Sequence, residues 1–171
     1  MPITPIKVKH YPLSNLGRAA LLIGLLLNII VWITIAYNYQ TSILQKSGAF
    51  FIVPAAFTLV FILYLLLLRY RYVLLERYPY LVNLPSFAYR LGMQNNREME
   101  GKVIAKVFTI HCLAALYISA LEVAIVYSVI PINGIQNTQL LLPSILIVIV
   151  VFLVTVFALY RSVYRSFAKK R

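Results

Sequence analysis

The sequence predicts an all-α integral membrane protein, a four-helix bundle with both chain termini on the cytoplasmic side. Three observations carry this prediction. Hydrophobic residues make up 62% of the 171 residues and charged residues only 12%, and the mean hydropathy is +0.86. Four long apolar runs follow one another along the chain, and the basic residues gather in alternate connections between them. A soluble domain carries about a quarter charged residues, so the composition favours the membrane class.

Each apolar run is long enough to be a membrane-spanning helix. The runs have roughly 19 to 28 residues, and a helix needs about 20 to cross the hydrocarbon core. They do not alternate polar and apolar residues as the strands of a membrane barrel would. We therefore predict a single transmembrane domain over residues 1–171, with a cytoplasmic interfacial segment at 69–102. The predicted spans are about 19–37, 48–68, 103–130 and 140–160.

The distribution of lysine and arginine predicts the orientation. Fifteen of these sixteen residues lie before the first span, after the fourth, or in the central segment 69–106, which reaches into the start of the third span. The connection between the first two spans holds only Lys46, and the connection between the last two holds none. Cytoplasmic connections carry the excess of basic residues. We therefore expect a multi-pass protein of the cell membrane, with its N- and C-termini in the cytoplasm.

The connection between the second and third spans differs in composition from the other two. It opens with "RYRYVLLERY", in which arginines and tyrosines suit a helix end that enters the headgroup region. Two prolines then end the helix, and apolar residues keep the segment at the membrane surface. We interpret its polar and proline residues as candidates for contact with the interface or a partner: Arg69, Arg71, Arg77, Pro79, Asn83, Pro85 and Arg90.

The pattern Tyr78-Pro79-x-Leu81-x-Asn83-x-Pro85 carries a family resemblance. With the apolar helix before it and the Asn/Arg/Glu-rich run after it, the segment resembles small uncharacterised bacterial four-helix membrane proteins. These look loosely related to bacteriocin-immunity-type membrane proteins. The similarity covers residues 60–125, and Tyr80 stands where the wider group often has histidine. The resemblance implies a bacterial multi-pass protein and brings no reaction with it.

Three polar residues inside the predicted spans are the intramembrane candidates: Glu122, His111 and Asn28. Ionisable groups are costly in a bilayer and therefore mark candidate functional sites. Glu122 and His111 are eleven residues apart, which places them on one helix face about 16 Å apart. One hypothesis is a proton or cation path that uses Glu122. The other is a protonated Glu122 that is hydrogen-bonded to a neighbouring helix. In this interpretation Asn28 serves only helix packing, by a hydrogen bond between helices that approach closely at Ala20 and Gly24.

The functional prediction is a non-enzymatic interaction or accessory subunit, with an immunity- or stress-related role as one possibility. The alternative is a small proton- or cation-coupled transporter or channel subunit that uses Glu122. A third class is a lipid-modifying membrane enzyme using Arg77, Asn83, Arg90 and Glu98. The sequence holds no cofactor or metal motif, so we predict neither. Expected partners are anionic lipid headgroups at the cytoplasmic face and a protein partner or second copy, but no nucleic acid.

Overall fold

A computed structural model describes residues 12–40, 49–77, 97–129 and 138–168. These residues form five α-helices and one 3₁₀ turn, and no strand occurs among them. The elements are α1 (Asn15–Gln40), α2 (Ala49–Arg69), α3 (Arg71–Arg77), α5 (Arg97–Val129), η2 (Thr138–Leu140) and α6 (Leu141–Ala168). The prediction of an all-α chain with four long apolar helices is confirmed.

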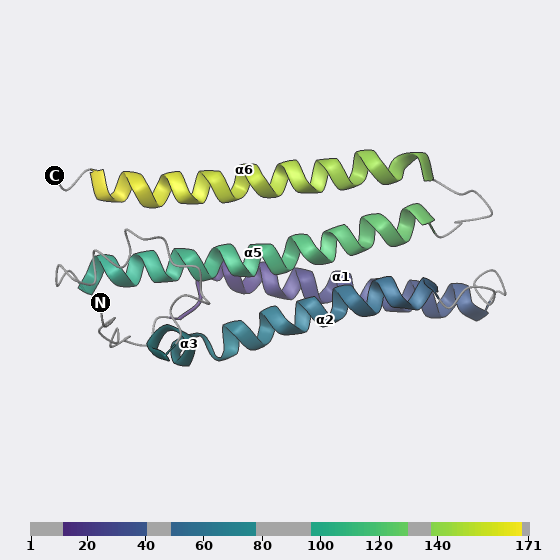
Figure 1. Ribbon diagram of the computed structural model, residues 1–171, viewed down its shortest axis with the longest axis horizontal. Helices are drawn as coiled ribbons and strands as arrows, with labels where there is room; N and C mark the ends of the chain where they lie inside the picture. Colours follow the sequence, from purple (N-terminus) through teal and green to yellow (C-terminus); the bar gives the residue numbers. More distant parts are fainter. Residues whose placement is uncertain (1–11, 41–48, 78–96, 130–137, 169–171) are drawn as a thin grey trace.

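Four of the helices are long and apolar enough to cross a membrane. They run along a common direction, and Figure 1 shows α5 between α6 on one side and α1 and α2 on the other. Among the parts of the chain described above, α6 contacts α5 and the η2 turn but neither α1 nor α2. The arrangement is therefore a three-helix group of α1, α2 and α5, with α6 alongside α5.

Helices α1 and α5 run parallel, and polar side chains pair along their interface from one end to the other. Each pair joins residues 93 to 95 positions apart in the sequence. A nearly constant separation is what two parallel helices in fixed register give. The pairs are Ser14–Thr109 at 2.7 Å, Asn28–Glu122 at 2.8 Å and Thr34–Tyr127 at 3.0 Å.

Small residues on α1 bring these two helices close together. A Cβ added at Gly24 would lie 3.3 Å from the backbone Cα of Leu116 and 3.0 Å from the ring of Phe61. A Cβ at Gly17 would lie 3.1 Å from the Cys112 sulfur. Close backbone approach at small residues is how helices associate in lipid, where water drives no apolar association.

The buried face of α1 repeats at helical spacing. Its buried residues are Gly17, Ala20, Gly24, Asn28, Val31 and Ile35. These positions are three or four residues apart, so they form one stripe of the helix. The stripe packs against α5, while large apolar side chains elsewhere on α1 stay exposed.

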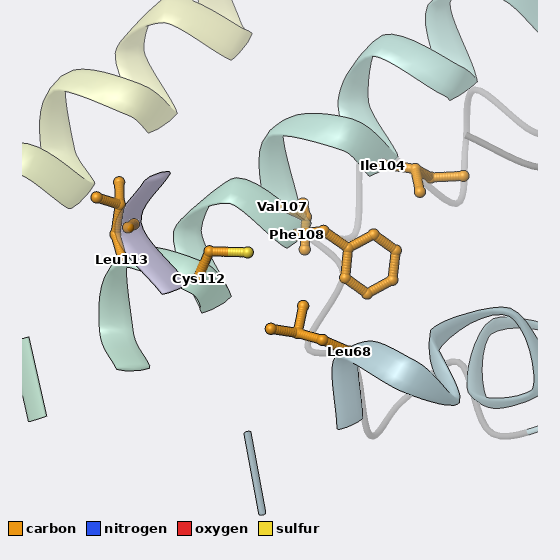
Figure 2. Packing of buried hydrophobic residues seen from close by; sticks show 7 residues of the cluster. Leu68, Ile104, Val107, Phe108, Cys112 and Leu113 are labelled. Atoms are coloured by element: carbon orange, nitrogen blue, oxygen red, sulfur yellow. The ribbon is translucent and has the colours of Figure 1, made fainter. Parts of the chain in front are cut away.

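A hydrophobic cluster joins α1, α2 and α5 near the starts of α1 and α5 and the end of α2. Leu68 of α2 lies opposite Phe108 and Cys112 of α5 (Figure 2). Ala20 of α1 completes the buried contact, and Leu74 of α3 packs against its side. The cluster fixes how α2 approaches the start of α5.

Arg71 stabilises the corner between α2 and α3. Its Nη1 donates to the Leu68 carbonyl at 2.7 Å, and its Nη2 donates to the Tyr72 hydroxyl at 3.0 Å. The guanidinium also lies 4.4 Å from the centre of the Tyr72 ring. The last carbonyls of a helix lack backbone donors, so this arginine completes the end of α2 where the chain bends at Tyr70.

Helix α6 is held from one side only. None of its most apolar window is buried, whereas half of the corresponding window of α5 is. Polar contacts that link it to α5 include the Tyr117 hydroxyl with Thr155 at 3.1 Å and Lys106 with Ser162 at 2.8 Å. The Tyr117 ring also packs on Phe152, with ring centres 5.3 Å apart.

Candidate functional site

The strongest candidate site is a buried polar cluster where α1, α2 and α5 meet. We call it the central polar cluster and define it as Asn28, Trp32, Thr58 and Glu122. Asn28 and Trp32 come from successive turns of α1, Thr58 from α2 and Glu122 from α5. The Glu122 side chain is 0% exposed and that of Asn28 only 6%. The backbones of α1 and α5 approach each other closely at Gly24, one turn before Asn28. This close approach brings the side chains of Asn28 and Glu122 within reach of each other.

Hydrogen bonds connect the four side chains. The Asn28 amide nitrogen donates to Glu122 Oε2 at 2.8 Å and lies 3.2 Å from the Thr58 hydroxyl. The Trp32 indole N–H donates to the same hydroxyl at 2.9 Å. Thr58 in turn donates to the Asn28 carbonyl oxygen at 3.3 Å. The cluster therefore links all three helices of the group by side-chain bonds.

One oxygen of Glu122 takes no part in this network. Oε1 is inaccessible to solvent, and it has no hydrogen-bond partner among the described residues. Oε2 has Asn28 as its partner. A buried polar atom without a partner is uncommon in native structures and calls for a physical explanation.

The surroundings of Glu122 offer no opposite charge. From residue 19 to the end of α1, over α2 before Arg69 and over α6 before Arg161, the sequence has no acidic or basic residue. A lone charge at the centre of a spanning helix costs about 2.5–3.5 kcal/mol on insertion scales. A side-chain hydrogen bond between spanning helices contributes about 0.6 kcal/mol and about 1.7 kcal/mol at most. One bond from Asn28 cannot offset an ionised carboxylate, so the contacts suit a neutral carboxyl.

The structure separates His111 from this cluster. The His111 ring lies beside Tyr64 of α2, with ring centres 6.2 Å apart, and beside Phe108 at 6.4 Å. It is half-buried, whereas Glu122 is fully enclosed. No hydrogen bond of the central polar cluster involves His111. The two ionisable residues of α5 therefore occupy different environments.

The interfacial candidates are described only in part. Arg69 and Arg77 are exposed, at the end of α2 and at the end of α3. Arg69 lies 5.9 Å from the centre of the Tyr70 ring, while Arg71 is turned toward the Leu68 carbonyl. Pro79, Asn83, Pro85 and Arg90 lie outside the described residues, as does the Tyr78–Pro85 pattern. In the described part of the chain, no group of three or more histidine, cysteine or acidic residues could hold a metal ion.

Two members of the central polar cluster were not singled out from the sequence. Trp32 follows Asn28 by four residues and so lies on the same face of α1, which is a signal that the sequence does contain. Thr58 gives no such signal, because nothing in an apolar helix marks which of its hydroxyls meets a neighbour. The pairing of Asn28 with Glu122 depends on the parallel register of α1 and α5, which only the fold reveals.

Comparison of the chain with protein-family models, with curated proteins and with solved structures gave no match. The observations that bear on function therefore lie in the helices themselves. Their arrangement offers two features: an enclosed acid within a three-helix group, and a fourth helix attached from one side.

Proposed function

We propose that this chain is a multi-pass protein of the cell membrane that works as a non-enzymatic interaction or accessory subunit. The observation that carries the proposal is the packing of α6. A lipid-facing helix is expected to expose apolar side chains, so exposure alone says little. What distinguishes α6 is that, within the described residues, it touches only one other long helix and buries nothing along its apolar window.

The orientation with both termini in the cytoplasm is part of the same proposal. Basic residues whose side chains are described lie toward the starts of α1 and α5, toward the ends of α2 and α6, and at both ends of α3: Arg18, Arg69, Arg71, Arg77, Lys106, Arg161 and Arg165. The described residues at the opposite ends of the helices carry no charge. Positive charge at one face agrees with a cytoplasmic location and with attraction to anionic headgroups, worth about 1 kcal/mol per basic residue.

A pull-down tests the proposal, using the tagged protein from its native membrane in mild detergent and native mass spectrometry. We expect a stoichiometric partner protein, with anionic lipids retained. Tryptophan at Val150 or Val154, exposed on α6, should release the partner, because a packed interface has no room for a larger ring while lipid does. Matched substitutions at Ile29 or Ile33, exposed on α1, should retain it. Recovery of the chain alone or as a small homo-oligomer would reject accessory status.

The biological setting of this subunit is proposed from the resemblance of residues 60–125 to small bacterial membrane proteins, including the immunity-type group. The resemblance supports an immunity- or stress-related role. Deletion of the coding sequence should then sensitise the host cell to membrane-directed toxins or envelope stress, and re-expression should restore resistance. Unchanged sensitivity to both would reject this role and leave the accessory proposal standing.

A second candidate function is proton- or cation-coupled transport through Glu122. It is favoured by one observation, the enclosed Oε1 atom without a partner among the described residues. Its test is a pH-dependent flux into proteoliposomes that hold the purified protein. Glu122→Gln should abolish the flux, and Glu100→Gln serves as the matched control. Flux that is absent from the native protein, or unchanged by Glu122→Gln, would reject transport through this residue.

A further inference from the structure

The direction of the hydrogen bonds in the central polar cluster defines what Glu122 can bind. The Trp32 indole N–H can only donate, so the Thr58 oxygen accepts from it and the Thr58 hydrogen turns to the Asn28 carbonyl. The Asn28 amide then directs its N–H₂ group at Glu122 Oε2. The bonds from Trp32 through Thr58 and Asn28 lead to the carboxyl, and bonds aligned in this way strengthen one another. The Asn28 amide nitrogen also donates to the Thr58 hydroxyl, at the longer distance of 3.2 Å.

This alignment leaves a single atom free for a ligand. Oε2 faces the positive end of the Asn28 amide, which repels a cation. Oε1 is the remaining lone-pair donor of the carboxyl, and it is fully enclosed. Sodium-like and divalent cations need several oxygen ligands around them. Among the described residues Oε1 has no hydrogen-bond partner, and no group of three or more histidine, cysteine or acidic side chains could hold a metal ion. A proton needs only one oxygen and almost no space.

We propose that the central polar cluster is a binding site for one proton, carried on Oε1 of Glu122, and that it excludes metal cations. The groups that face this carboxyl are neutral: Asn28 and Trp32 from α1, and Thr58 from α2. On α5 itself Ser119, one turn before, donates to the Ala115 carbonyl. The span of α6 offers no ionisable group except tyrosine. The bound proton therefore neutralises an acid that has no counter-charge.

The proton site and the second candidate function concern the same carboxyl, that of Glu122, and the proton site rests on that function in this respect alone. Transport requires that the proton enters and leaves from two sides. Binding requires only that the carboxyl is neutral in the folded protein. The experiment therefore reads the protonation state directly and does not read flux.

Infrared spectroscopy of the full chain, reconstituted in phosphatidylcholine–phosphatidylglycerol vesicles at neutral pH, tests the site. A neutral carboxyl has a C=O stretch at a higher frequency than a carboxylate, and the band shifts in D₂O. We expect the difference between the native protein and Glu122→Gln to show one such band. Glu100→Gln, the matched control, should leave that band in place. Only carboxylate bands in the Glu122→Gln difference would overturn the proposal.

Two further comparisons, one of salts and one of variants, decide which ligand is bound and which residue positions it. Replacing choline chloride with sodium or potassium chloride should leave the band unchanged, and loss of the band in either salt would show a metal cation in place of the proton.

Asn28→Leu should move the band to higher frequency, because the C=O group loses its donor. Thr58→Val, which retains the Asn28–Glu122 bond, should give a smaller shift. An unmoved band in Asn28→Leu would reject the assignment of Asn28 to Oε2. If the neutral-carboxyl band is present but the proteoliposomes show no flux, the proton site stands and transport through Glu122 is rejected.

Discussion

The Asn28–Glu122 hydrogen bond should couple α1 and α5 measurably. At 2.8 Å it is the shortest bond of the central polar cluster, and Asn28 is the only described partner of the carboxyl. Side-chain bonds between spanning helices average about 0.6 kcal/mol and reach about 1.7 kcal/mol. Because the loss of Asn28 leaves an enclosed carboxyl with no partner, we expect a coupling free energy of about 1–1.7 kcal/mol, at the upper end of this range.

A double-mutant cycle measures this coupling. It uses Asn28→Ala, Glu122→Ala and the double variant, each unfolded reversibly by sodium dodecyl sulfate in mixed micelles. The only tryptophan of the chain, Trp32, reports unfolding by its fluorescence because it belongs to the same cluster. Circular dichroism supplies a second probe of the same transition. The three free energies of unfolding, compared with that of the native protein, give the interaction term.

The control cycle combines Asn28→Ala with Thr109→Ala. Thr109 pairs with Ser14 in the same helix interface, and Ser14 lies fourteen residues, or about 21 Å, before Asn28 along α1. Substitutions that far apart should add within about 0.3–0.5 kcal/mol. If the Asn28–Glu122 cycle is equally additive, the two side chains do not stabilise each other and the proposed role of the cluster in joining the helices is refuted.

Three other predictions concern single contacts. Gly24→Ala should lower the free energy of unfolding by about 1–2 kcal/mol, because the new Cβ meets the Leu116 backbone. Gly17→Ala should be near neutral, because its new Cβ meets side-chain atoms that can move. Thermal unfolding in detergent compares the stabilities of the two variants. Thr58→Val should shift the tryptophan emission to shorter wavelength and cost about 1 kcal/mol, because it removes the acceptor of the partly buried Trp32 indole N–H. An unmoved spectrum would contradict the contact. Arg71→Ala should cost about 1 kcal/mol through the lost bonds to the end of α2, while Arg77→Ala, at an exposed site, should leave the melting temperature unchanged.

The sequence identifies the helices of this protein better than it identifies their neighbours. Length and hydropathy suffice for the four long helices, because a span must be apolar over about 20 residues whatever it packs against. In a soluble protein, an apolar stripe on an otherwise polar helix shows which face packs inside. A helix that is apolar all round has no such stripe. When lipid-facing and buried faces are both apolar, periodicity no longer tells which side of a helix is inside.

Small and polar residues supply the packing information that remains. Gly24 and Asn28 mark the packed face of α1 because a glycine permits close approach and an amide needs a partner. Glu122 marks the inner face of α5 by the same reasoning. Helix α6 has no glycine and no amide or acid from Leu141 to Ala168, and it is the helix with no buried residue in its apolar window. What the sequence leaves open is the parallel register of α1 and α5, which depends on the shapes of two apolar surfaces.

The three-helix group of α1, α2 and α5 resists insertion of a partner helix, whereas α6 can accept one, and the reason is physical. The hydrogen bonds of the central polar cluster, and close contacts such as that at Gly24, all lie among α1, α2 and α5. To separate these helices would leave polar groups without partners in hydrocarbon, which is costly. Helix α6 depends on Tyr117, Lys106 and side-chain packing along one face. A partner helix that docks beside α6 would therefore displace only lipid and break no buried hydrogen bond of the three-helix group. A partner inserted between α1 and α5 would have to break the Asn28–Glu122 bond, so we expect association on the α6 side and not at the cluster.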